Sequence, residues 1–213
     1  MRTVIIKYNA GNVQSVRYAL ERLGVTPELS DDEATIRAAD RVIFPGVGEA
    51  STAMRYLRAK HLDQLLPTLQ QPVLGICLGL QLMCTHSEEN DTPCLGIFDV
   101  PVRRFRPSQP ALKVPHMGWN TLNTRGENPL LAGIGAPAYV YFVHSYYAAL
   151  GEHTAATCDY VHPFSAMLHR DNFYACQFHP EKSADVGARI LENFVRGRLP
   201  TAETAGRAAE RAE

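Results

Sequence analysis

The sequence has few cysteines, and none of them stands in a C-x-x-C pair. Its five cysteines are an odd number scattered along the chain: Cys77, Cys84, Cys94, Cys158 and Cys176. Such a set predicts neither a disulfide framework nor a thiolate zinc site, so we expect no metal and no cofactor. In a reducing compartment, a single well-placed cysteine is instead a candidate nucleophile.

The sequence also lacks an excess of charge of one sign and any long apolar run. It carries 21 Lys and Arg against 22 Asp and Glu, a formal net charge of −1. This balance gives no electrostatic footprint for nucleic acid or for an anionic membrane. The apolar run at the N-terminus is too short for a signal-peptide core, and no later segment is long enough to span a bilayer. We therefore expect a cytoplasmic protein.

The chain has no internal repeat and no interdomain linker. The 213 residues suit one domain, which we expect to occupy residues 1–199. Residues 200–213 contain almost no bulky apolar side chain, and we expect them to form a disordered tail.

Buried-strand patterns alternate with helical patterns in the first half of the chain. The expected strands are residues 3–7, 41–44 and 73–76, and the clearest helices are 13–23 and 50–57. This alternation predicts an α/β fold with a mixed, largely parallel open sheet flanked by helices. Aromatic and β-branched runs between about residues 95 and 177 predict added antiparallel strands in the second half. A last helix follows Ser183, which we expect to cap it.

The third predicted strand runs into the pattern G-x-C-x-G, with Cys77 between Gly75 and Gly79. A strand, this pattern and then a helix are typical of a nucleophile elbow, here with sulfur as the nucleophile. Glycines relieve the crowding of so tight a turn, and the positive end of the helix favours the thiolate. The N–H of Leu78 would point into the same space and help to bind an oxyanion. The alternative is a buried structural cysteine, the commoner fate of this residue.

A thiol nucleophile needs a general base, and the base needs a partner that orients it. The stretch QFHPEKS contains His179 and Glu181, two residues apart. Pro180 favours an extended backbone at His179, so we expect both side chains to face one site. An exposed His beside a Glu is commonplace, and the pair is informative only together with the elbow.

The segment PGVG, residues 45–48, follows a predicted buried strand. In an open α/β sheet, this position lies at the carboxyl edge, where sites form. Backbone N–H groups near Val47 and Gly48 would complete an oxyanion hole with Leu78. An ordinary strand-to-helix turn is the alternative. A phosphate loop is disfavoured because no Gly-Lys-Ser/Thr follows.

These three segments, in this order, resemble the class I (triad) glutamine amidotransferases. Two further segments, KVPHMGWN at 113–120 and YFVHSYY at 141–147, resemble the glutaminase (HisH-type) subunits of imidazole glycerol phosphate synthase. The resemblance extends over nearly the whole chain. One departure is Lys7-Tyr8-Asn9, where the family is expected to have an Asp-Tyr-Gly type segment.

The resemblance implies a role for each matching residue. Cys77 would attack the side-chain amide of L-glutamine, His179 would protonate the leaving ammonia, and Glu181 would orient His179. The residues implied in binding the substrate are Gly46, Gln81, Glu89, Ser145 and Tyr146. Gln81 facing water and Glu89 in a solvated charge pair are the plainer alternatives.

The resemblance also implies a partner, because one domain leaves no room for an ammonia acceptor. That partner would be the cyclase subunit, a (β/α)8 barrel of the HisF type, in a heterodimer that makes imidazole glycerol phosphate during histidine biosynthesis. Trp119 and Lys182 are the expected interface residues. The alternatives are the same chemistry serving another synthase, a catalytically silent binding module, and a thiol hydrolase that works alone.

Overall fold

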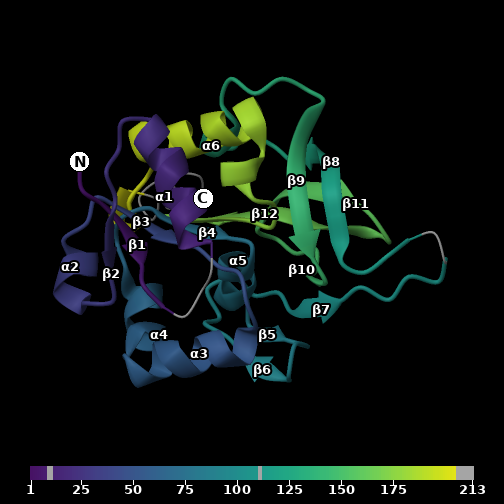
Figure 1. Ribbon diagram of the computed structural model, residues 1–213, viewed down its shortest axis with the longest axis horizontal. Coiled ribbons are helices and arrows are strands. Elements are labelled where there is room, and N and C mark those ends of the chain that lie inside the picture. The colour runs from purple at the N-terminus through teal and green to yellow at the C-terminus, as the bar shows by residue number, and fades with distance from the viewer. Residues whose placement is uncertain (9–11, 110–111, 205–213) are drawn as a thin grey trace, which may run out of the picture.

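A computed structural model describes residues 1–8, 12–109 and 112–204 of the chain. Parallel strands form one end of its sheet, in the order β2-β1-β3-β4-β13, and Figure 1 labels the first four of them. Their bounds are β1 Thr3–Ile6, β2 Glu28–Ser30, β3 Arg41–Phe44, β4 Val73–Ile76 and β13 Phe173–Cys176. The predicted parallel α/β sheet is therefore confirmed.

Helices cover both faces of this parallel sheet. Figure 1 shows α1 and α6 on one face, and α3, α4 and α5 on the other. Their bounds are α1 Val13–Arg22, α3 Ala50–Ala59, α4 Leu62–Leu65, α5 Leu78–Met83 and α6 Ala184–Arg196. Two short elements complete this half, α2 Glu33–Arg37 and the 3-10 turn η1 Leu66–Thr68.

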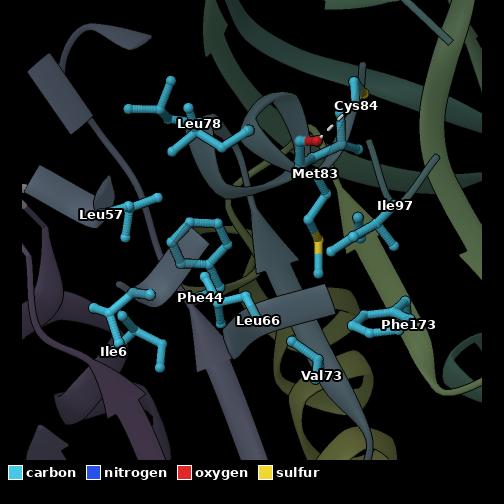
Figure 2. Packing of buried hydrophobic residues seen from close by; sticks show 14 of the residues in the cluster. Ile6, Phe44, Leu57, Leu66, Val73, Leu78, Met83, Cys84, Ile97 and Phe173 are labelled. Carbon is cyan, nitrogen blue, oxygen red and sulfur yellow. Dashed lines mark hydrogen bonds between the residues drawn. The ribbon is translucent and has the colours of Figure 1, made fainter. Parts of the chain in front are cut away.

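The strands β1, β3, β4 and β13 divide their apolar side chains between two cores. Ile6 and Phe44 pack with α3, α4 and α5, whereas Ile5 and Ile43 pack with α1 and α6. Successive side chains of a strand point to opposite faces, so a strand buried on both faces reads as a continuous apolar run. Figure 2 shows the first of these cores, with Phe44 at its centre.

Antiparallel strands extend the sheet in the second half of the chain, as the sequence predicts. The strand β12 pairs with β13, and further antiparallel pairings lead outward through β10 to β7. Beyond β7, the strand β5 pairs in parallel and β6 is antiparallel to β5. The strand β11 joins β12 to the hairpin of β8 and β9. The bounds are β5 His86–Ser87, β6 Thr92–Pro93, β7 Val102–Arg104, β8 His116–Thr124, β9 Ala138–His144, β10 Tyr146–Ala148, β11 Thr154–Asp159 and β12 Pro163–Arg170, with 3-10 turns η2 Pro129–Leu131 and η3 Pro180–Lys182.

The expected cap of the last helix is wrong. Ser183 precedes α6, but its side chain makes no capping hydrogen bond. Instead, the Ser183 hydroxyl donates to the His179 carbonyl at 2.6 Å and accepts from the Tyr141 N–H at 2.9 Å. The hydroxyl is therefore used to join β9 to the turn after β13.

The expected tail lies mostly outside the described residues, since 205–213 are not described. At its start, the N–H of Ala202 donates to the Gln70 carbonyl at 3.0 Å. Disorder beyond this point stays a prediction. Among the described residues, no helix is both long and apolar enough to cross a membrane.

Candidate active site

Cys77 stands on the corner between β4 and α5. Its backbone has φ 52° and ψ −105°, a strained conformation for a residue with a Cβ atom. The Cys77 N–H donates a hydrogen bond of 2.8 Å to the Cys176 carbonyl of β13, which fixes the position of this corner against the sheet. The elbow predicted from the sequence is therefore present, with the thiol at its apex.

The two glycines of the elbow are required by close approach. A Cβ atom on Gly79 would lie 2.0 Å from the carbonyl oxygen of Phe44. One on Gly75 would lie 2.6 Å from the sulfur of Met83 and 3.0 Å from the backbone of Gly79. Real Cβ atoms do not come within 2.0 Å of a backbone oxygen, so α5 packs against β3 only because Gly79 lacks a side chain. At Gly75 a side chain would require the end of the Met83 side chain to shift.

His179 and Glu181 meet as predicted, although the backbone differs from the expected one. His179 is extended, but the next three residues form the 3-10 turn η3 rather than an extended segment. The His179 Nδ1 lies 2.7 Å from the Glu181 Oε1, and both side chains are almost fully buried. The 3-10 turn therefore brings the Glu181 carboxylate next to the Nδ1 atom of His179.

The second ring nitrogen of His179, Nε2, is buried and has no hydrogen-bond partner of ordinary geometry. The imidazole nevertheless lies close enough to Cys77 for the two side chains to interact. Burial acts to lower the pKa of His179, but Cys77 and Glu181 outweigh burial and raise this pKa to about 10. The imidazole is therefore held as a cation between a sulfur and a carboxylate.

A pocket of about 280 Å³ opens in front of Cys77. This volume suits a ligand the size of an amino acid. Most of the predicted catalytic and binding residues meet here, since the lining is Val47, Gly48, Cys77, Leu78, Gln81, Glu89, Pro115, Val143, His144, Ser145 and Tyr146. Three of those predicted residues lie outside the lining: Gly46, His179 and Glu181. A larger hollow of about 400 Å³ lies beside η2, but its lining contains no cysteine or histidine.

The predicted oxyanion hole is not assembled in this structure. The Leu78 N–H donates to the Gly46 carbonyl at 3.2 Å, so this donor is already occupied. In a trans peptide, N–H and C=O point in opposite directions. The N–H of Val47, which shares a peptide with the Gly46 carbonyl, therefore points away from Leu78. Gly46 itself is tightly enclosed, because a Cβ there would lie 2.6 Å from the Tyr8 hydroxyl.

Glu89 and Gln81 both line the pocket, but their surroundings differ. One Glu89 oxygen accepts from the N–H of Ala50 at 2.8 Å, and the carboxylate is partly buried. Burial raises the pKa of Glu89, against the lowering effect of the Ala50 N–H. Gln81 is buried rather than facing water, so that alternative is wrong.

Several residues of the site were missed by reasoning from the sequence. The side-chain amide of Asn12, just before α1, donates to the same Glu181 oxygen that binds His179. The amide nitrogen of Gln177 lies 3.7 Å from the Cys77 sulfur. Gln177 stands inside the QFHPEKS motif, so its position was a signal, whereas nothing in the sequence connects Asn12 with Glu181.

His116 and His144 form a buried pair, of which His144 lines the pocket. The Nδ1 of His116 lies 3.0 Å from the Nε2 of His144, and the Nδ1 of His144 lies 2.7 Å from the Tyr146 carbonyl. Burial lowers the pKa of His116 to about 4 and that of His144 to about 3. Both imidazoles are therefore neutral near pH 7. Among the described residues, no group of His, Cys, Asp and Glu side chains is arranged to hold a metal ion.

Known proteins resemble this chain over most of its length. The family model "Glutamine amidotransferase class-I" matches residues 4–197. The "Imidazole glycerol phosphate synthase subunit HisH" of Bacteroides thetaiotaomicron is 56% identical over 195 residues, which are 92% of this chain and 99% of that protein. The HisH protein of the same name from Idiomarina loihiensis is 47% identical, over 92% of this chain and 97% of its own.

Solved structures share the fold. A protein described as a glutamine amidotransferase has a TM-score of 0.68 at 19% identity, covering 95% of this chain and 98% of its own. A glutamine amidotransferase from Thermotoga maritima has a TM-score of 0.62 at 17% identity, and the match covers 99% of this chain and 92% of the Thermotoga chain. Taken with the elbow, the buried His–Glu pair behind it and the 56% identity, the family match shows that this chain belongs to the class-I glutamine amidotransferases, among the HisH subunits of imidazole glycerol phosphate synthase.

Proposed function

We propose that this chain hydrolyses L-glutamine at Cys77 and delivers the ammonia to a cyclase subunit that makes imidazole glycerol phosphate in histidine biosynthesis. The observation that supports the proposal is the order of three side chains at the pocket. Cys77 stands on its strained corner, His179 interacts with Cys77, and Glu181 binds the other nitrogen of His179. The names of the HisH relatives support this choice of pathway. We place this reaction in the cytoplasm, because a reducing compartment keeps thiols free and the five cysteines are free thiols.

In the first half of the reaction, the Cys77 thiolate attacks the carboxamide carbon of glutamine. The carbon–nitrogen bond breaks, the nitrogen takes a proton from the His179 imidazolium, and ammonia leaves behind a γ-glutamyl thioester. A pKa of about 10 means that His179 carries this proton at neutral pH. In the second half, His179 accepts a proton from water, which attacks the thioester carbonyl. The carbon–sulfur bond breaks, glutamate is released, and the Cys77 thiolate and the His179 imidazolium are restored.

The substrate's amino-acid end is assigned to the part of the pocket lined by Glu89, Ser145 and Tyr146. Glu89 supplies a partly buried carboxylate, which suits the ammonium group of glutamine. Ser145 and Tyr146 supply polar atoms near the substrate carboxylate. Pairing with the ammonium would favour ionised Glu89, against the effect of burial.

The partner is proposed to be the HisF-type (β/α)8-barrel cyclase, in a heterodimer. The outer face of the β8–β9 hairpin supports a docking surface, because Met117, Trp119 and Tyr139 are each more than half exposed. Lys182 is exposed on η3. The residues on either side of this turn, His179 and Ser183, are hydrogen-bonded to the Tyr141 backbone of β9. Ammonia that passes across such an interface avoids bulk water, which would protonate it.

The occupied Leu78 N–H supports a gated enzyme. For Val47 to donate to the oxyanion, the Gly46–Val47 peptide must turn over and release Leu78. Glycines at 46 and 48 permit this change, and Gly48 already has φ 132°. Partner binding at the β8–β9 hairpin would favour the turned state only if the cyclase and its nucleotide ligand bind that state more tightly.

The test is covalent labelling by a glutamine analogue with an electrophilic carbon in place of the carboxamide. We expect labelling of Cys77 alone among the five thiols, faster in the complex with the cyclase than in the free chain. Mass spectrometry of the digested protein identifies the labelled residue. A complex in which Cys77 stays unlabelled, or is labelled no faster than Cys94, contradicts the proposed nucleophile.

A further inference from the structure

A chain of hydrogen bonds fixes the orientation of two buried glutamine amides beside Cys77. The amide nitrogen of Gln81 lies 2.9 Å from the Tyr146 carbonyl oxygen and 3.1 Å from the side-chain oxygen of Gln177. A backbone carbonyl only accepts, so the Gln81 atom facing Tyr146 is necessarily the NH2 group. The second hydrogen of that NH2 group requires an acceptor in turn, and Gln177 Oε1 provides it.

The remaining end of Gln177 is therefore its NH2 group, and this end faces the thiol. The Gln177 Nε2 lies 3.7 Å from the Cys77 sulfur, a distance suited to an N–H donor and a large sulfur acceptor. Gln177 is fully buried. Water does not compete for this donor, so its orientation toward sulfur depends on Gln81 and Tyr146 alone.

The anchor of this chain is itself held in place. The Tyr146 carbonyl accepts a second hydrogen bond from His144, whose other nitrogen faces His116. Because burial keeps both imidazoles neutral at neutral pH, His144 donates through Nδ1 and accepts through Nε2. His144 and Gln81 therefore both donate to the Tyr146 carbonyl, Gln81 also donates to Gln177, and Gln177 donates to the Cys77 sulfur. No two donors and no two acceptors face each other in this chain of hydrogen bonds.

We infer that Gln177 is a fourth functional side chain of the thiol site, whose amide N–H stabilises the Cys77 thiolate, with Gln81 as its positioning residue. The inference rests on the proposed role of Cys77 as nucleophile. Hydrogen bonds to a charged group are stronger than those to its neutral form, so the donor favours the thiolate over the thiol.

Gln177 and His179 would support the thiolate in different ways. His179 gives its proton to the departing ammonia and loses its charge, whereas an amide N–H keeps its hydrogen throughout the reaction. Gln177 therefore still faces sulfur with a donor when the thiolate leaves the thioester in the second step. Gln177 therefore stabilises the Cys77 thiolate both when it attacks the carboxamide and when it leaves the thioester, and no proton is transferred to or from Gln177.

The test is the pH profile of Cys77 alkylation by iodoacetamide in the full-length chain carrying Gln177→Met. Methionine has nearly the same length but no donor. We expect the profile to move to higher pH by about one unit, with alkylation about tenfold slower at pH values well below its midpoint. Gln177→Leu serves as a second variant with the same expected direction.

The matched control is Gln71→Met, at the opposite end of β4, where the amide donates to the Ile36 carbonyl at 2.8 Å. It makes the same chemical change away from sulfur, and its alkylation profile should equal that of the unchanged protein. Thermal unfolding shows whether each variant is folded. A folded Gln177→Met or Gln177→Leu protein with an unchanged profile overturns the inference.

Glutamate release by the complex with the cyclase separates this inference from the proposed function. If Cys77→Ser abolishes release while both Gln177 variants match the unchanged protein, only the role of Gln177 is wrong. If Cys77→Ser retains full release, the proposed nucleophile is wrong, whatever the Gln177 variants do. Loss of release in Cys77→Ser with slowed release in the Gln177 variants supports both.

Discussion

Cys77 combines strain with reactivity at a single residue. A residue with a Cβ atom at φ 52° and ψ −105° costs on the order of 1–3 kcal/mol relative to an unstrained backbone. The fold supplies that energy because Gly75 and Gly79 allow α5 to approach the sheet. The strained corner places Cys77 in the lining of the pocket, although the residue is 6% exposed.

This strain predicts an unusual order of stability among variants of Cys77. Glycine adopts positive φ without a Cβ penalty, so Cys77→Gly should be about 1 kcal/mol more stable than Cys77→Ala. Elsewhere in folded segments, the order is normally the reverse. Urea unfolding of both variants measures the difference. A Cys77→Ala protein as stable as Cys77→Gly would contradict strain at the elbow.

The buried pair of His116 and His144 predicts that the free energy of unfolding decreases in acid. The folded pKa values of His116 and His144, about 4 and 3, lie below the unfolded value of about 6.5. Between these limits the unfolded chain binds more protons, so the free energy of unfolding falls as the pH decreases from about 6.5 toward 4. The pair should contribute a loss of about 2 kcal/mol or more by pH 5.

Urea unfolding at pH 7 and pH 5 measures this loss. The matched variant replaces both residues, His116→Gln with His144→Gln, and should lose less stability between the two pH values than the unchanged protein. Equal losses in the two proteins would contradict the assignment of the pH dependence to this pair.

Among the elements, α5 depends on close backbone packing against β3. A methyl group on Gly79 would lie 2.0 Å from the Phe44 carbonyl of β3, and neither backbone has room to move. Gly79→Ala should therefore cost about 3 kcal/mol or more, or prevent folding. The control is Gly135→Ala, where the added methyl meets no atom within 4 Å. Similar unfolding midpoints for the two variants would contradict this account of the elbow.

The elements that were predicted share strong local patterns. The strands β1, β3 and β4 are continuous apolar runs, and the buried stripe of α1 recurs at helical spacing. The strand β2 and the helix α2 were missed because they are three and five residues long. Pairing with β1 stabilises β2, and no pattern within three residues reveals such a tertiary hydrogen bond.

The site was predicted as far as its residues follow sequence motifs. The contact of His179 with Glu181 was predicted on an extended backbone, but it forms across a 3-10 turn. The neighbours Asn12 and Gln177 reach the site through contacts far apart in the chain. The occupied Leu78 N–H was also beyond prediction, because the orientation of one peptide leaves no trace in the sequence.

For the whole molecule, the outer face of the β8–β9 hairpin is the surface that we assign to the partner. Trp119 is 53% exposed and lies edge-on to Tyr141, with ring centroids 6.0 Å apart. A large aromatic side chain at the centre of an interface commonly contributes about 2 kcal/mol or more. Trp119→Ala should therefore weaken binding of the cyclase by roughly thirtyfold, as measured by titration calorimetry.

The matched control is Tyr18→Ala, which removes an aromatic side chain of similar exposure, 54%, from α1. Its affinity for the cyclase should equal that of the unchanged chain. An affinity of Trp119→Ala equal to that of Tyr18→Ala would place the partner on another surface.

The most direct test of the whole account is glutamate release from glutamine in three states. These are the chain alone, the chain with the cyclase, and the complex with the cyclase's nucleotide ligand, each beside Cys77→Ser. We expect little release by the chain alone, because the Leu78 N–H is hydrogen-bonded to the Gly46 carbonyl, and a large rise in the liganded complex that Cys77→Ser abolishes. Equal release in all three states would contradict gating by the partner, and release by Cys77→Ser would contradict the nucleophile.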